Sequence, residues 1–156
     1  MDMNWRQEVA AETTAIEDVN ANPAMLIVRI DTLGEMFGGS AKVVELQRHL
    51  SVNAPEPVNL RLVDGKNYVS GDFVCRVAFV YLKEAFEPLP QDPEIRVNGV
   101  LKTLTDLRPF TADNNWGIDV GDDKIVIGGD AWTIAAIRGL KWLGGEPAEF
   151  EFTLRS

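Results

Sequence analysis

The C-terminal half of the chain contains one stretch of sequence that occurs twice. DPEIRVNGVLKTLTDLR (92–108) aligns without gaps with DDKIVIGGDAWTIAAIR (122–138), and each copy has the pattern of a strand, a glycine turn and a second strand. The turn dipeptides Asn98-Gly99 and Gly128-Gly129 tolerate the positive φ angles that tight hairpins require. Because all such hairpins obey the same turn rules, the two copies are also compatible with two unrelated hairpins. Either way, this half of the chain is predicted to be β-rich.

Further strand patterns lie on the N-terminal side of this repeat. AMLIVRI (24–30) is short, apolar and partly β-branched, which is typical of a buried strand. Residues 58–80 contain a predicted strand pair around Asp64-Gly65, a favoured hairpin dipeptide. From Asp72 the apolar residues alternate, so we expect a strand that reaches Val80 and then a helical turn.

The last residues of the chain, EFEFTLRS, alternate between apolar and polar side chains. Phe150, Phe152 and Leu154 fall on one face, which predicts the closing strand of a barrel or sandwich. In the second hairpin, four apolar residues can share an inner face: Ile125, Ile127, Trp132 and Ile134.

Two helices are predicted in the N-terminal third. Residues 4–18 carry an apolar stripe at helical spacing, formed by Trp5, Val9, Thr13 and Ile16. This helix either lies on the core of its own chain or docks on a neighbouring subunit. Residues 41–50 are predicted as a second helix with Ser40 as its N-cap and a face of Val43, Leu46, Gln47 and Leu50.

Together these patterns predict a single domain over residues 1–156. A helix-containing segment (1–57) precedes a β-rich core (58–156). The expected fold is mainly β with flanking helices, a small antiparallel β-barrel or sandwich with an N-terminal helix.

Composition restricts the partners of the chain. The net charge is −9 and no Lys/Arg-rich run occurs, which disfavours sequence-specific nucleic-acid binding and binding to anionic membranes. No apolar run approaches the roughly 20 residues of a transmembrane helix, and the N-terminus lacks the pattern of a secretory signal. A single cysteine, Cys75, is compatible with a reducing cytoplasm.

No catalytic, cofactor or metal site is predicted from the residues. His49 is the only histidine, too little for a zinc site or a Cys/His pair. The stretch 34–42 places its lysine wrongly for a phosphate-binding loop, and 113–123 lacks the glycine and glutamate of an EF-hand. A weak calcium contact remains an open alternative for three carboxylates: Asp119, Asp122 and Asp123.

Two of the four tryptophans, Trp116 and Trp142, are expected in glycine-bounded loops. Exposed loop aromatics often anchor interfaces, whereas burial over the end of the barrel is the alternative.

The second hairpin and the final strand resemble head–tail connector (head-closure or neck) proteins of long-tailed bacteriophages. The resemblance covers about the last 40 residues of the chain, and residues 1–90 share only a general layout with that family. It rests on EFEFTLRS and on seven positions of the hairpin: Asp123, Ile125, Ile127, Gly129, Trp132, Ile134 and Ile137.

The resemblance implies a virion structural protein without enzyme activity. Such proteins form homo-oligomeric rings in the neck, between the portal or adaptor and the tail tube or terminator, after assembly in the host cytoplasm. DNA passes through the ring without sequence-specific binding. The residues that we expect at subunit interfaces are Trp5, Val9, Ile16, Trp116, Trp142, Phe150 and Phe152.

Three other functions stay open at this point. A tail terminator or tail-completion subunit is close to the connector hypothesis. A small β-barrel could instead bind a ligand or peptide with Trp116 and Trp142 at its mouth. A hydrolase would need two buried carboxylates in one cleft.

Overall fold

The computed structural model describes residues 21–31, 43–58 and 71–156, and this part of the chain is mainly β, as predicted. A separate two-stranded sheet contains β5 (Ile95–Val97) and β6 (Val100–Lys102). The large antiparallel sheet has seven strands, in the spatial order β2 (Val43–Asn53), β1 (Ala21–Asp31), β7 (Lys124–Ile127), β8 (Asp130–Leu143), β9 (Glu146–Arg155), β4 (Phe73–Ala78) and β3 (Glu56–Pro57).

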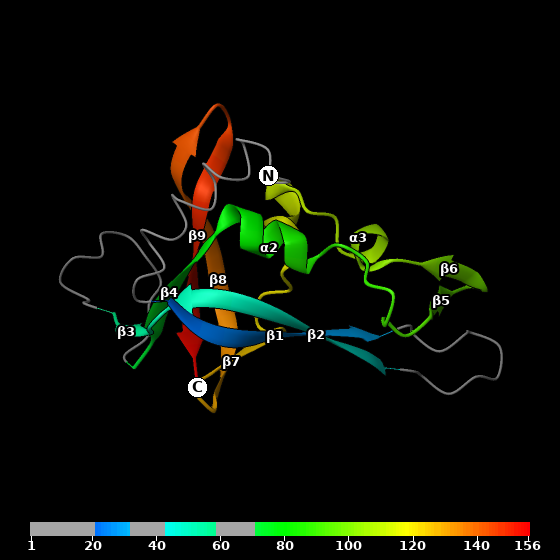
Figure 1. Cartoon of the computed structure of the whole chain (residues 1–156), viewed down its shortest axis with the longest axis horizontal. Helices are drawn as coiled ribbons and strands as arrows, with labels where there is room; N and C mark the ends of the chain where they lie inside the picture. The colour runs from blue at the N-terminus through cyan, green and yellow to red at the C-terminus, as the bar shows by residue number, and fades with distance from the viewer. Residues whose placement is uncertain (1–20, 32–42, 59–70) are drawn as a thin grey trace, which may run out of the picture.

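The large sheet curls, so that strands near its two ends approach each other (Figure 1). Strand β2 also pairs with β4, but only between Val52 and Val77. The sheet is therefore not a closed barrel, which was one of the two predicted architectures. The final strand β9 lies inside the sheet between β8 and β4, and its alternation places Phe150, Phe152 and Leu154 in the core as predicted.

Helix α2 (Phe79–Ala85) follows β4 directly and packs on β2 and β9. The predicted change from strand to helix is confirmed, although the strand ends at Ala78 and not at Val80. Two short helical segments complete this layer, α3 (Leu104–Leu107) and the 3-10 helix η3 (Ala112–Gly117). Leu82 and Phe86 are buried, so the helical side covers the apolar face of the curled sheet.

The predicted helix at 41–50 is wrong, because these residues belong to strand β2. Val44, Leu46, Leu50 and Val52 are buried on one face, and the residues between them are more exposed. Arg48 occupies the remaining inward position, and a charged residue there hides the period of two in the sequence. The described part of the N-terminal segment is thus strand.

Both predicted hairpins are present. The turn residues Asn98 and Gly99 have φ angles of 53° and 77°, and Gly128 and Gly129 have 58° and 87°, all in the left-handed region. The two copies differ after the turn. In the first copy, the side chains and backbones of Thr103 and Asp106 form a capping box that starts α3. In the second copy the chain continues as the long strand β8.

Several predictions fall outside the described residues. They are the helix at 4–18 with Trp5, Val9 and Ile16, the loop at 34–42, and the hairpin turn at Asp64-Gly65.

A buried ion pair fixes the connector after α2 against the sheet. The Arg48 side chain is 4% exposed, and its two terminal nitrogens each donate to an Asp92 carboxylate oxygen at 2.7 Å. Its Nε donates to the carbonyl of Ala85 at 2.8 Å, and the backbone N–H of Leu89 donates to Asp92 at 2.9 Å. Burial opposes ionisation of Asp92, but the hydrogen bonds from Arg48 and Leu89 outweigh it and lower its pKa.

Replacing Asp92 by Asn is expected to lower the free energy of unfolding at neutral pH by about 3 kcal/mol, because it leaves the Arg48 cation buried without a counterion. The pKa of Asp92 lies below its ordinary value of 3.8, so its contribution is present above pH 3.8 and is lost as the pH falls further. Urea unfolding of both proteins across this pH range measures the effect. The control is Glu94→Gln at an exposed pair, which should change little. Equal stabilities of D92N and the parent at pH 7 would contradict the prediction.

Candidate functional site

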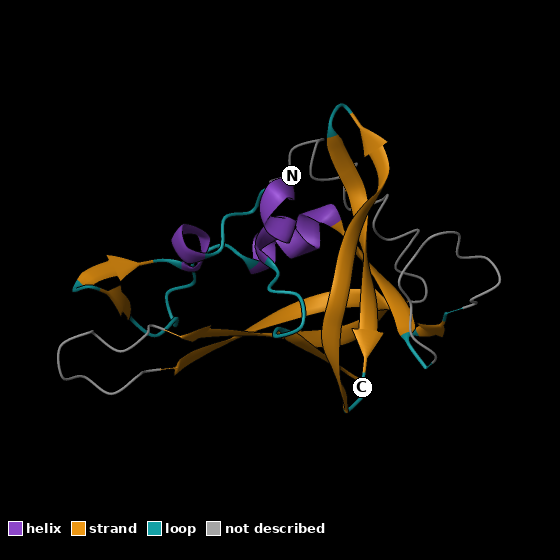
Figure 2. Cartoon of the chain, turned by 180° about the vertical axis from the view of Figure 1, so that it is seen from behind, coloured by secondary structure: helices purple, strands orange, loops and turns teal. Residues whose placement is uncertain are grey.

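The hairpin formed by β8 and β9 projects from the body of the molecule (Figures 1 and 2). Strand β7 pairs only with the first four residues of β8, and β4 pairs with β9 no further than Glu149. Beyond these points the hairpin is a two-stranded ribbon that ends in the turn Gly144-Gly145, with φ angles of 60° and 87°. At its tip Trp142 is 51% exposed and Leu143 is 79% exposed. We call the segment 141–146 the hairpin tip.

The conformation of the hairpin tip depends on close packing of Trp142 against its own hairpin. Lys141 has a φ of 55°, which is uncommon for a non-glycine residue in a strand. The indole N–H of Trp142 donates to the carbonyl of Gly139 at 3.1 Å. A Cβ atom on Gly139 would lie 2.7 Å from Trp142 Cζ2 and 2.8 Å from Pro147 Cβ, so only glycine fits there. The tip is therefore held in one shape although half of the indole remains exposed.

An aromatic cluster connects the hairpin to the core. The Trp116 ring centroid lies 6.1 Å from that of Trp142 and 4.8 Å from that of Phe150. Phe150 also contacts Phe79 of α2 at 5.6 Å and Phe110 at 6.0 Å. These rings support the base of the hairpin, so a load on the tip is passed to a packed core.

The structure places some of the predicted interface residues in the core and one of them at the surface. Phe150 and Phe152 have no exposed surface, because both face inward from β9, and so they belong to the core of the chain. Trp116 is 9% exposed and lies in η3, which is the predicted alternative of burial. Trp142 lies in strand β8 and not in a loop, as had been expected, and its side chain is half-exposed.

The sequence reasoning missed Leu143, the more exposed residue of the tip. The sequence feature that could have indicated it is the Gly144-Gly145 dipeptide, which marks a hairpin turn directly after Leu143 in the same way as Gly128-Gly129. It also missed the apolar tip of the β5–β6 hairpin, where Val100 and Leu101 are 54% and 55% exposed.

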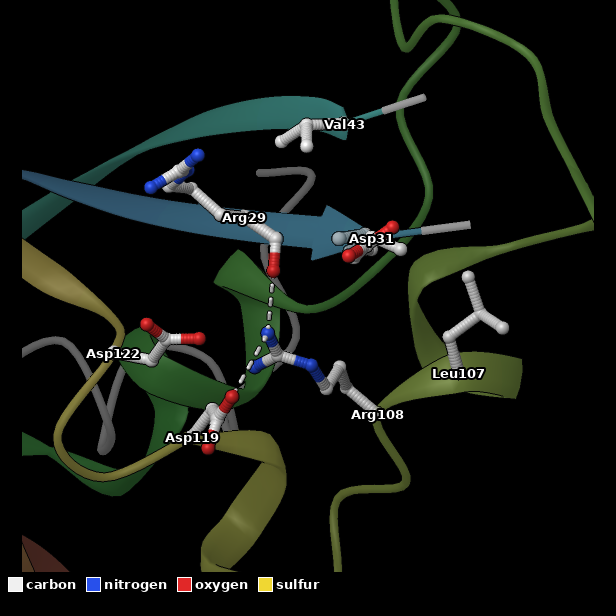
Figure 3. A pocket seen from close by; sticks show the side chains of 8 residues that line it. Arg29, Asp31, Val43, Leu107, Arg108, Asp119 and Asp122 are labelled. Atoms are coloured by element: carbon white, nitrogen blue, oxygen red, sulfur yellow. Dashed lines mark hydrogen bonds and ion pairs between the residues drawn. The ribbon is translucent and has the colours of Figure 1, made fainter. Parts of the chain in front are cut away.

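A pocket of about 410 Å³ lies beside Arg108 (Figure 3). The Arg108 guanidinium donates to both oxygens of Asp123, at 2.8 and 3.3 Å, and to the carbonyls of Gly117 and Arg29, each at 2.9 Å. Asp119 Oδ2 lies 4.0 Å from it. The guanidinium thus joins β1, η3 and the start of β7, and its terminal donors are used within the chain. Its role is structural, and it does not offer an anion site.

The acidic segment that follows η3 is part of the same clamp. Asp123 is fully buried, and its Oδ2 also accepts the backbone N–H of Asp119 at 2.9 Å. Burial raises the pKa of Asp123, and the hydrogen bonds from Arg108 act in the opposite direction. Within the described ranges no group of three His, Cys, Asp or Glu side chains is placed to hold a metal ion.

The environments of the remaining buried carboxylates, of the histidine and of the cysteine do not indicate a reactive group. The buried carboxylates Asp72 and Glu149 each have cationic partners, Arg155 at 2.8 Å and, for Glu149, Lys141 at 3.4 Å. His49 is exposed on β2. Burial and the nearby charge of Glu151 raise the pKa of the Cys75 thiol to about 12, so the thiolate is strongly disfavoured.

Comparison with family models, with curated proteins and with solved structures gives no match to this chain. In the described residues, none of the helices has the length and apolar character needed to cross a bilayer.

Replacing Gly139 by Ala is expected to displace the Trp142 ring and to lower the free energy of unfolding by about 2 kcal/mol, because the added methyl group overlaps Trp142 and Pro147. Near-ultraviolet circular dichroism and urea unfolding measure the two effects. The same change made together with Trp142→Ala should cost less than it does alone, because one of the two clashes is gone. An unchanged spectrum in G139A would refute this packing.

Arg108 and Arg138 occupy equivalent positions in the sequence repeat, which provides a matched pair of variants. Arg108→Met leaves the fully buried Asp123 carboxylate without its cation. We expect this variant to lower the free energy of unfolding by about 4 kcal/mol at neutral pH. Protonation of Asp123 relieves the unpaired charge, so this loss should shrink as the pH falls. The Arg138 side chain is 45% exposed beside Glu151, so Arg138→Met should lower the free energy of unfolding by about 1 kcal/mol or less. Equal losses for the two variants, by urea unfolding, would exclude the clamp.

Proposed function

We propose that this chain is a structural virion protein that forms a homo-oligomeric ring in the neck of a long-tailed bacteriophage. In this proposal the ring joins the portal or adaptor to the tail. The observation that carries the assembly part of the proposal is the hairpin tip, where Trp142 and Leu143 are held at the end of a projecting ribbon. The phage part is supported by the sequence resemblance of the second hairpin and the final strand.

The hairpin tip has the properties of a subunit contact. Leu143 is 79% exposed although its side chain is entirely apolar, and Trp142 beside it belongs to the residue type most enriched at energetic hot spots. Packing against Gly139 fixes the indole before binding, so little side-chain entropy is lost on association. A preformed apolar tip therefore favours docking on another protein surface.

The charge of the chain agrees with a position around DNA. A net charge of −9 gives little attraction for phosphate, so a ring of such chains would let DNA pass without holding it. A tail terminator or tail-completion subunit would share this property and the ring, and the two differ in their position on the particle.

Two other functions have less support from the geometry. Trp116 and Trp142 pack on each other at 6.1 Å, and Trp116 is buried, so the pair does not line an open ligand-binding mouth. The buried carboxylates Asp72, Asp123 and Glu149 each have a cationic partner, which does not provide the acid and base of a hydrolase.

The proposal is tested on the source particle. Mass spectrometry of purified virions should detect the chain, and antibody labelling in electron microscopy should place it at the junction of head and tail. In the purified protein, Leu143→Ser should weaken self-association about tenfold, as measured by light scattering over a concentration series. The matched control is Val120→Ser, which removes a 39% exposed apolar side chain outside the hairpin tip. Absence of the chain from virions would overturn the proposal.

A further inference from the structure

We infer that Asn98 is a site of spontaneous covalent modification, at which the side-chain amide is lost and the backbone between Asn98 and Gly99 rearranges. This inference does not depend on the proposed function. Asn98 and Gly99 form the two-residue turn between β5 and β6, and both residues are exposed. Within the part of the chain that the structure describes, no hydrogen bond holds the Asn98 side chain in place.

The reaction requires only these two residues, hydroxide and water. The backbone nitrogen of Gly99 loses its proton to hydroxide and attacks the side-chain carbonyl carbon of Asn98, Cγ, within the same molecule. A bond forms from this nitrogen to Cγ, and the bond from Cγ to the side-chain nitrogen breaks. The side-chain nitrogen takes a proton from water and leaves as ammonia, which regenerates the hydroxide. Water then opens the cyclic imide, either at Cγ to give aspartate or at the main-chain carbonyl carbon to give isoaspartate.

Gly99 leaves the attacking nitrogen accessible. A Cβ atom at this position would have no neighbour within 4 Å, and glycine itself places no side chain beside the nitrogen. Among the described turns and loops, no backbone hydrogen bond uses the N–H of Gly99. The Arg96 guanidinium donates to the carbonyl of Gly99 at 3.2 Å, so a cation lies close to the nitrogen that becomes negative during the attack.

The hairpin of β5 and β6 opens without disturbing the large sheet. The two strands form a separate sheet of three residue pairs, which lies apart from the large sheet (Figure 1). A lone two-stranded hairpin is only marginally stable, and such elements open locally more often than a core does. Opening is required, because a turn with φ angles of 53° and 77° holds the Gly99 nitrogen away from Asn98 Cγ.

Asn115 provides a comparison within the same chain. It is exposed and has a φ of 50°, close to that of Asn98. The nitrogen that would attack its side chain belongs to Trp116, which is 9% exposed and whose N–H donates to the carbonyl of Thr111 at 2.8 Å. This nitrogen is both bonded and shielded, so Asn115 is expected to stay unchanged in the folded protein.

The modification distinguishes the two copies of the repeat. Isoaspartate adds one main-chain carbon to the two-residue turn, which disturbs the pair Val97–Val100 that closes it. The half-exposed side chain of Val100 then changes its position at the tip of this hairpin. The second hairpin has Gly128 at the position equivalent to Asn98, so it has no side chain that could react.

Peptide mapping by mass spectrometry tests this inference on the folded protein kept at mildly alkaline pH. The peptide that contains Asn98 should gain the mass of an amide-to-acid change and separate into two isomers, aspartate and isoaspartate. Its conversion should be about tenfold faster than that of Asn115, because only Gly99 offers a free nitrogen. Conversion of Asn115 at the rate of Asn98 would overturn the inference.

The matched variant is Asn98→Gly, which gives the first turn the same dipeptide as Gly128-Gly129. Glycine accepts the φ of 53° at this position, so the variant should fold with an unchanged unfolding midpoint and should lose the fast release of ammonia. Equal ammonia release by N98G and the parent chain also overturns the inference. The parent chain in urea shows the rate without a folded turn. If Asn98 reacts in urea and does not react in the folded protein, the hairpin does not open and the inference is wrong.

Discussion

The aromatic ring of Phe150 is the contact on which the packing around the hairpin depends. It lies on β9, without exposed surface, and it contacts α2 through Phe79 and η3 through Trp116. These elements come from three separate parts of the sequence. Because the ring fills the space between them, the helical layer, the curled sheet and the base of the projecting hairpin form one packed unit.

Three ion pairs, each with at least one buried partner, add further contacts between distant segments. Arg48–Asp92 fixes the connector after α2 to β2, Arg108–Asp123 joins three segments beside β7, and Arg155–Asp72 joins the two ends of neighbouring strands. Each pair bridges segments that are apart in the sequence. Such pairs contribute little net stability compared with apolar packing, but removal of one partner is costly, so they make the arrangement specific.

Much of the β architecture was readable from local patterns. Turn dipeptides marked both hairpins, and the alternation of Phe150, Phe152 and Leu154 marked β9. Strand β2 was not readable, because the inward position in the middle of its apolar face is Arg48, whose partner Asp92 lies in a distant loop. The pairing order of the strands also depends on such distant contacts.

The candidate site was predictable only in part. Trp142 was recognised as an aromatic residue near glycines, but its place in β8 depends on the left-handed Lys141 and on the fit to Gly139. Phe150 and Phe152 were assigned to an interface, although their alternation also fits the core where the structure places them. The packing of α2 on β2 could not be predicted, since the two are far apart in the chain and β2 itself had been taken for a helix.

The pairing of the β8–β9 hairpin with its neighbours in the sheet has a mechanical consequence. The two strands pair from the tip down to Thr133 and Arg155, and β4 holds the lower part of β9 over six residue pairs. These hydrogen bonds run perpendicular to the strands. A pull on the tip along the ribbon moves β8 and β9 together, so it loads the bonds of β9 to β4 and of β8 to β7 in shear at once and does not open them one after another. The hairpin is therefore expected to resist force along its own axis better than force across it.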